Sequence, residues 1–125
     1  MNKSIQLRGI VFAGLAVILG AFGAHALKTM LPIDKLQVFE TGIRYQVIHA
    51  IALIVLSFDK ANIWTKRAAL ALTIGIILFS GSLYLIASNS ILPFSFGAWL
   101  GPITPIGGLF FIVGWFCWGM AAYRG

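Results

Sequence analysis

A run of polar and ionisable side chains opens one of the apolar stretches of the chain. Glu40 and Arg44 are four residues apart with the acid first, the favourable order for an ion pair along a helix. Thr41, Tyr45 and His49 repeat at the same spacing. On a helix at roughly 100° per residue, this run covers about half of the circumference, too wide for one lipid-facing seam. Acid and histidine side chains in such a place can relay protons or bind ions and polar solutes.

Two interpretations of this run stay open. Glu40 is expected in the first turn of its helix, where a negative charge complements the helix dipole. An interfacial Glu40–Arg44 salt bridge that orients the helix is the structural interpretation. The functional interpretation is a site shared with His25, a lone histidine that we expect to hydrogen-bond to a neighbouring helix rather than to bind a metal.

Further hydroxyl groups come later in the chain. Ser82 can bond back to its own helix or across to a neighbour, and a Ser82–His49 dyad lacks the carboxylate that would orient it. Thr104 followed by Pro105 predicts a helix start, with Thr104 as the N-cap. The candidate polar site therefore comprises His25, Glu40, Thr41, Arg44, Tyr45, Gln46, His49, Ser82 and Thr104.

The composition indicates that these residues lie in a membrane protein. The chain has 125 residues, of which 60% are hydrophobic and 10% charged, against about 25% charged in soluble domains. Its net charge of +6 comes from cations that flank apolar segments and can contact anionic lipids, without the basic stripe of a nucleic-acid-binding surface. The single cysteine, Cys117, excludes an internal disulfide, and no cofactor or metal motif is present.

Four apolar segments predict an all-α integral membrane four-helix bundle that forms one domain over residues 1–125. Each approaches the ~20 residues that span a hydrocarbon core of ~30 Å, and the short connections predict antiparallel neighbours. The first is longer than the ~7–15 apolar residues of a signal peptide. The segments are Gly9–Leu27, Val38–Phe58, Ala68–Ala87 and Ile106–Tyr123.

The distribution of lysine and arginine predicts the orientation. Cations precede the first helix, flank the connection after the second and follow the fourth, so the positive-inside rule places both termini in the cytoplasm. The candidate polar site then falls in the outer half of the membrane. Trp115 and Trp118 belong to an aromatic cluster that suits the cytoplasmic interface.

Two other segments suggest close helix packing or contact with the membrane. Ala16, Gly20 and Ala24 recur every four residues, and such stripes let helix backbones approach closely, within one chain or between two copies. Residues 91–100 are uncharged and apolar. They predict either an interfacial segment anchored by Trp99 or a segment that dips into the membrane.

Several motifs together resemble one known family, the small bacterial membrane proteins of the YgdD/YwdK type, which are filed under a domain of unknown function. The resemblance spans nearly the whole chain in matching order. It implies a multi-pass protein of the bacterial inner (plasma) membrane and no established reaction, substrate or cofactor. The motifs are Gly20–Leu27, Phe39–Gln46 with His49 and Ala50, Phe79–Tyr84, and Gly101–Gly108 followed by Gly114 and Trp115.

Two functions compete on these observations. The first is binding or passage of a small polar solute, an ion or a lipid head group at the polar site, with a second copy completing any conducting path. The second is a structural or accessory role, in which the polar site only stabilises the bundle and another membrane protein supplies the chemistry. We expect no enzyme, because nucleophile, base and orienting group do not occur together.

Overall fold

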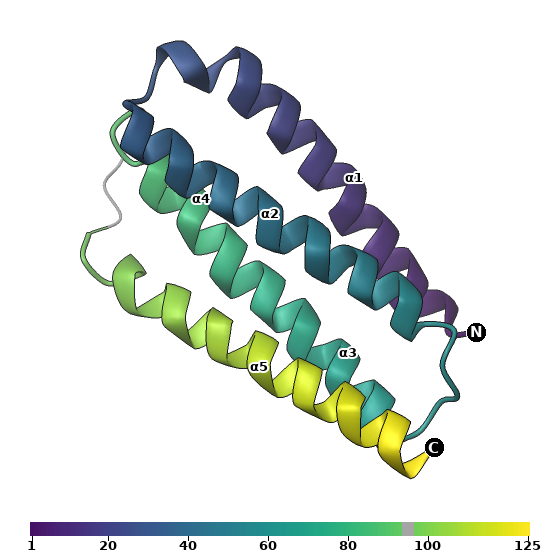
Figure 1. Cartoon of the computed structure of the whole chain (residues 1–125). Helices are drawn as coiled ribbons and strands as arrows, with labels where there is room; N and C mark the ends of the chain where they lie inside the picture. The colour runs from purple at the N-terminus through teal and green to yellow at the C-terminus, as the bar shows by residue number, and fades with distance from the viewer. Residues whose placement is uncertain (94–96) are drawn as a thin grey trace.

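The computed structural model describes residues 1–93 and 97–125, and its four long helical segments confirm the predicted membrane bundle (Figure 1). Each segment is long and apolar enough to cross a membrane. The first two are α1 (Lys3–His25), followed by the short helix η1 (Leu27–Thr29), and α2 (Ile33–Leu56). The third consists of α3 (Ile63–Gly75), η2 (Ile76–Ser80) and α4 (Gly81–Ser88), and the fourth is α5 (Leu100–Arg124).

Each of the four spans begins five or six residues before its predicted apolar segment, and α1 and α3 begin at polar caps. The Asn2 side chain accepts a hydrogen bond from the Ile5 amide at the start of α1. Asn62 forms a capping box with Thr65 at the start of α3. Caps of this kind satisfy amides that have no partner within the helix.

The predicted start of the last helix at Thr104 is wrong. The helix α5 begins at Leu100, so Thr104 is its fifth residue and Pro105 lies inside it. Pro105 removes the hydrogen bond to the carbonyl of Gly101, but that carbonyl lies in the exposed first turn, where water can replace the lost donor. The Thr104 hydroxyl is therefore free to reach another helix.

Both termini and the connection at 57–62 lie at one end of the bundle, which we call the terminal end (Figure 1). The opposite end, the loop end, holds η1 and the connection that precedes α5. The spans run in the order α1, α2, α4 and α5 across Figure 1. This arrangement agrees with the predicted antiparallel neighbours, and the cytoplasmic position of the termini stays a prediction.

The third span changes from α- to π-helix over Ile76–Ser80 and then returns to α-helix. The wider turn shifts the side chains that follow relative to α3, as π-turns do where they re-aim functional residues. It directs the Ser80 hydroxyl to α2, while the Phe79 ring reaches α5. A Cβ on Gly107 would lie 2.4 Å from the Phe79 backbone nitrogen, so this glycine permits α5 to meet the π-turn.

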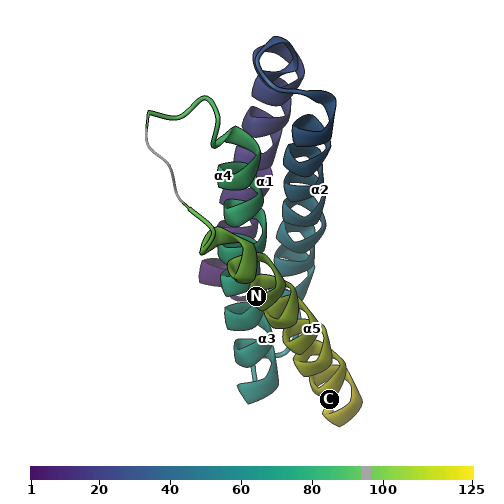
Figure 2. The ribbon, with the colours of Figure 1, turned by 90° about the vertical axis from the view of Figure 1, so that its left-hand side faces the viewer.

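Two apolar clusters hold the bundle together. The larger, at the terminal end, joins all four spans through residues such as Leu53, Leu72 and Phe111. The smaller, at the loop end, includes Leu27 and Phe39. Along the bundle, α1 packs on α2 and α5 packs on α3, while α2 also contacts the third span (Figure 2).

The small residues of α1 that pack most closely differ from the expected stripe. Ala16 is buried, but Gly20 and Ala24 border a shallow groove of about 200 Å³ against α2. The tightest approach is at Gly9, where a Cβ would lie 2.7 Å from the carbonyl oxygen of Ala50. Gly9 thus serves packing between α1 and α2 within one chain, and a contact of the stripe with a second copy stays a prediction.

Candidate functional site

A layer of hydrogen-bonded polar side chains lies between the two apolar clusters. Gln46 is only 3% exposed and joins three spans. Its amide nitrogen donates to the carbonyl oxygen of Phe12 on α1 at 2.7 Å, and its amide oxygen accepts from the Tyr84 hydroxyl on α4 at 2.6 Å. All the hydrogen-bonding atoms of this side chain except one amide N–H are therefore engaged by the protein itself.

Three further hydroxyl groups complete this layer. Ser80 donates to the carbonyl oxygen of Gly42 at 2.6 Å, which ties the π-turn to α2. The oxygens of Ser82 and Thr104 lie 2.6 Å apart and join α4 to α5. Within residues 1–93 and 97–125, every buried side-chain nitrogen and oxygen has a hydrogen-bond partner. We call the following residues the buried polar layer: Gln46, Ser80, Ser82, Tyr84 and Thr104.

His49 lies one turn beyond Gln46 and is 4% exposed. Its Nδ1 is 2.7 Å from the carbonyl oxygen of Tyr45, and its Nε2 accepts from the indole nitrogen of Trp115 at 3.0 Å. An acceptor at Nε2 requires the neutral ring with the proton on Nδ1, which then donates to Tyr45. The ring also stacks on Phe111, with centroids 3.6 Å apart. Both nitrogens are thus committed, and Ser82 lies outside their hydrogen bonds.

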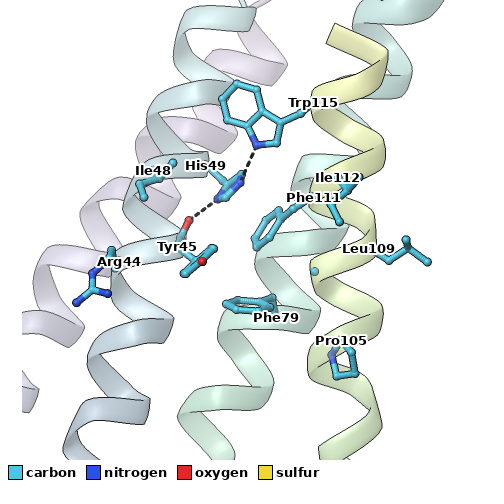
Figure 3. Close-up of a pocket in the computed structure, with 11 residues that line it drawn as sticks. Arg44, Tyr45, Ile48, His49, Phe79, Pro105, Leu109, Phe111, Ile112 and Trp115 are labelled. Atoms are coloured by element: carbon cyan, nitrogen blue, oxygen red, sulfur yellow. Dashed lines mark hydrogen bonds between the residues drawn. The ribbon is translucent and has the colours of Figure 1, made fainter. Parts of the chain in front are cut away.

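Beside this layer, a crevice of about 650 Å³ opens between α2 and α5 (Figure 3). His49, Phe111 and Trp115 meet between the two helices at one part of its wall, and Phe79 and Tyr45 continue it toward Pro105. Its outer rim carries exposed apolar side chains, Ile48, Leu109 and Ile112, together with the exposed Arg44. We call this feature the α2–α5 crevice; its lining is Arg44, Tyr45, Ile48, His49, Phe79, Pro105, Gly108, Leu109, Phe111, Ile112 and Trp115.

The wall of the crevice offers a ligand mostly apolar surface. The polar atoms of His49 and Trp115 already bind each other or the backbone. The Tyr45 side chain is 38% exposed, and in the part of the chain that the structure describes its hydroxyl makes no hydrogen bond. Arg44 and the Tyr45 hydroxyl are therefore the hydrogen-bonding groups that remain for a ligand.

The structure does not form the expected Glu40–Arg44 ion pair. Both side chains are exposed, and among the described residues neither has an ionic partner. Glu40 borders the groove between α1 and α2, whereas Arg44 borders the α2–α5 crevice. Glu40 is also not in the first turn of α2, where Asp34 is the acidic residue, because the helix begins at Ile33.

Arg44 lies within the apolar segment of α2. It is the twelfth residue of the 24-residue helix and lies six residues, about 9 Å at 1.5 Å per residue, beyond Val38, where the apolar segment begins. An arginine at the bilayer centre costs about 2.5–3.5 kcal/mol on insertion scales, which is an upper limit for this shallower position. An exposed guanidinium within the apolar segment, without an acidic partner among the described residues, would be stabilised by an anion.

Two candidate residues lie apart from both features. Thr41 donates to the carbonyl oxygen of Gln37 in its own helix, at 2.9 Å. His25 is exposed in the last turn of α1, where a cation complements the helix dipole, and within the described part of the chain it forms no hydrogen bond to a neighbouring helix.

Sequence reasoning missed four residues that shape the site: Ser80, Tyr84, Phe111 and Trp115. Phe111 and Trp115 are four residues apart, which places them on one face of α5. Trp115 is the sixteenth residue of α5 and is therefore too deep for the interfacial belt that we expected. By contrast, the indole nitrogen of Trp118 donates to Asp59 in the connection at the terminal end, and its place at the cytoplasmic interface stays a prediction.

Comparison with known proteins identifies the family. Residues 19–108 match the family described as "Protein of unknown function (DUF423)". The chain is 42% identical to the UPF0382 membrane protein YwdK of Bacillus subtilis, with 98% of each chain covered. It is 34% identical to the UPF0382 inner membrane protein YgdD of Escherichia coli K12, covering 85% of this chain and 82% of the relative. No solved structure matches.

The chain therefore belongs to the DUF423 family, as the sequence motifs predicted. The relatives are membrane proteins, two of them named inner membrane proteins, and the four spanning helices agree. The chain is thus a multi-pass protein of the bacterial inner membrane, surrounded by lipid. The family carries no assigned molecular function, so the function must be argued from the site.

Proposed function

We propose that this DUF423 protein binds an anionic, single-chain amphiphile in the α2–α5 crevice. The observation that carries the proposal is Arg44, an exposed cation at the rim of an aromatic crevice within the apolar segment of α2. A carboxylate or phosphate near Arg44 would offset the cost of its charge and accept its planar, bidentate donors. The Tyr45 hydroxyl supplies one more donor beside it.

The size and course of the crevice suit a hydrocarbon chain. Its volume of about 650 Å³ lies within the ~300–1,000 Å³ of small-molecule sites. From Pro105 to Trp115 the lining spans eleven residues of α5, a rise of about 15 Å. An amphiphile with its head group at Arg44 would extend its tail toward Trp115, deeper in the membrane.

The structural alternative rests on a different observation. The buried polar layer is paired within the chain, which is what a layer that only stabilises the bundle requires. Both roles fit one molecule, since the layer and the crevice occupy neighbouring faces of α2. We assign no reaction to either. A second copy or another membrane protein in the crevice is an alternative occupant that crosslinking at its rim would reveal.

Brominated fatty acid tests the proposal, because bromine quenches nearby tryptophan fluorescence. Trp115 lines the crevice, so we would replace Trp64, Trp99 and Trp118 with Phe, confirm folding by thermal melting, and titrate dibromostearic acid into nanodiscs. We expect saturable quenching of Trp115. The matched probe is the brominated fatty alcohol, which has the same chain without the charge and should bind about tenfold more weakly.

Three results would overturn the proposal. Equal affinity for acid and alcohol would remove Arg44 from recognition. Quenching that rises linearly without saturation, at the level of bulk lipid, would mean that the crevice holds no specific amphiphile. A crosslinked second copy or partner helix at Ile112 in the same nanodiscs would assign the crevice to a protein instead.

A further inference from the structure

A second cationic feature lies at the terminal end, away from the crevice. The guanidinium carbon of Arg67, on α3, is 5.2 Å from the ring centroid of Trp64. That of Arg124, at the end of α5, is 5.6 Å from the same ring. Arginine within about 6 Å of an indole ring forms a favourable cation–π contact, so Trp64 gathers two cations from two helices. We call Arg67 and Arg124 the terminal arginine pair.

The terminal arginine pair has no acidic partner among the described residues. Both side chains are exposed, and the nearby connection contributes one acid, Asp59, which accepts a hydrogen bond from Trp118 at 2.6 Å. Two like charges on one ring repel each other, and a shared anion removes that repulsion. The distribution of charge also favours an anion here. The terminal end carries six lysines and arginines and one acid, for a net charge of +5, whereas the rest of the chain carries three lysines and arginines and two acids, for a net charge of +1.

We propose that the terminal arginine pair binds the phosphate of an anionic phospholipid in the leaflet at the terminal end. Guanidinium groups match phosphate oxygens in a bidentate fork, and both guanidinium carbons lie over the ring of one tryptophan, a residue type that favours the membrane interface. The apolar side chains Ile63 and Leu70 on α3 are 55% and 57% exposed and can lie against the acyl chains.

This site is independent of the amphiphile crevice. The crevice is bordered by Arg44 in the half of α2 nearer the loop end, and the terminal arginine pair lies at the other end of the bundle. Failure of either proposal therefore leaves the other standing.

Lipid retention tests the terminal site. The chain would be purified from membranes of equimolar phosphatidylcholine and phosphatidylglycerol, and native mass spectrometry would count retained lipids. Each arginine near an anionic surface contributes about 1 kcal/mol, so R67Q and R124Q should each lower phosphatidylglycerol retention about fivefold, and the double variant about thirtyfold. The matched control is the K28Q/K35Q double variant, which loses the same charge at the loop end and should retain the lipid.

Three outcomes would overturn this second proposal. Retention by the R67Q/R124Q variant at the level of the unmodified chain would remove the pair from recognition. Equal losses in the K28Q/K35Q control would indicate a general charge effect. Protection by inorganic phosphate that equals protection by phosphatidylglycerol, in thermal melts in detergent, would indicate a soluble anion in place of a lipid.

Discussion

The buried polar layer and the α2–α5 crevice begin at neighbouring residues of α2 and yet differ in every physical respect. Gln46 is buried and its amide binds two other helices, whereas Tyr45 lines the crevice and its hydroxyl makes no hydrogen bond to the described residues. The layer consists of neutral groups whose partners are each other or backbone carbonyls. The crevice has a mostly apolar wall and one cation, Arg44, without an acidic partner among the described residues. The polar residues of this helix therefore divide between holding the bundle together and, in the proposed function, binding a ligand.

The largest expected effect on stability comes from a substitution at Gly107, for which the adjacent Gly108 provides the control. G107V places a methyl-bearing carbon against the Phe79 backbone, because even a Cβ would lie 2.4 Å from its nitrogen. We expect a loss of about 3 kcal/mol or more in folding free energy, since a backbone cannot yield as a flexible side chain does. Reversible unfolding in mixed detergent measures it. G108V, one residue on, is the control and should keep the stability of the unmodified chain, because its Cβ would approach the Phe79 ring only to 3.8 Å.

The next effect breaks the buried polar layer. Q46A leaves the Tyr84 hydroxyl and the Phe12 carbonyl without their partner, and buried groups left so cost about 1–3 kcal/mol. We expect a loss of about 2 kcal/mol in the same unfolding measurement. Q37A, an exposed glutamine of the same helix, should change stability by less than about 0.5 kcal/mol. Equal effects of the two variants would contradict a structural role for the layer.

Filling the crevice should weaken binding without weakening the fold. G108L projects a side chain into the crevice from a position that has room for it. We expect the affinity for dibromostearic acid to fall at least tenfold, which is about 1.4 kcal/mol, with an unchanged melting temperature. Retained affinity in G108L would place the bound fatty acid elsewhere on the protein.

The smallest effect concerns the hydroxyl pair at the edge of the layer. S82A removes the partner of Thr104, and side-chain hydrogen bonds between membrane helices average about 0.6 kcal/mol. We expect a loss of that size in stability and none in fatty-acid affinity. S90A, in an exposed turn, is the comparison and should leave both quantities unchanged.

Much of this architecture could be predicted from the sequence, because length and apolar composition decide whether a helix spans a membrane. The four spans and their antiparallel order followed from these alone. The π-turn at Ile76–Ser80 could not, since the contacts that accompany it lie on other helices: Gly107 on α5 admits the Phe79 backbone, and Gly42 on α2 accepts from Ser80. Hydropathy predicts the helix starts too late, because it detects the hydrocarbon span and not the helical turns that precede it.

Part of the candidate site can be predicted from the sequence, because polar residues are conspicuous within apolar segments. Gln46, His49 and Ser82 stood out as polar residues in apolar surroundings, and the structure brings them to adjoining places. The sequence does not identify their partners. Trp115 and Phe111 are common residue types in membrane helices, and only the fold shows that they contact His49. The spacing of the acid and the arginine on α2 suggested a pair, but spacing alone does not fix rotamers, and the two side chains border different grooves.

The most direct test of this division of roles measures two quantities on R44Q and Q46A together: the affinity for dibromostearic acid by Trp115 quenching, and the folding free energy. We predict that R44Q lowers the affinity about tenfold and keeps its stability, because Arg44 has no partner among the described residues of the chain. Q46A should lose stability and keep the affinity of its folded fraction. If instead the two variants lost affinity and stability in the same proportion, the layer and the crevice would be one structural unit, and the division of roles between them would be refuted.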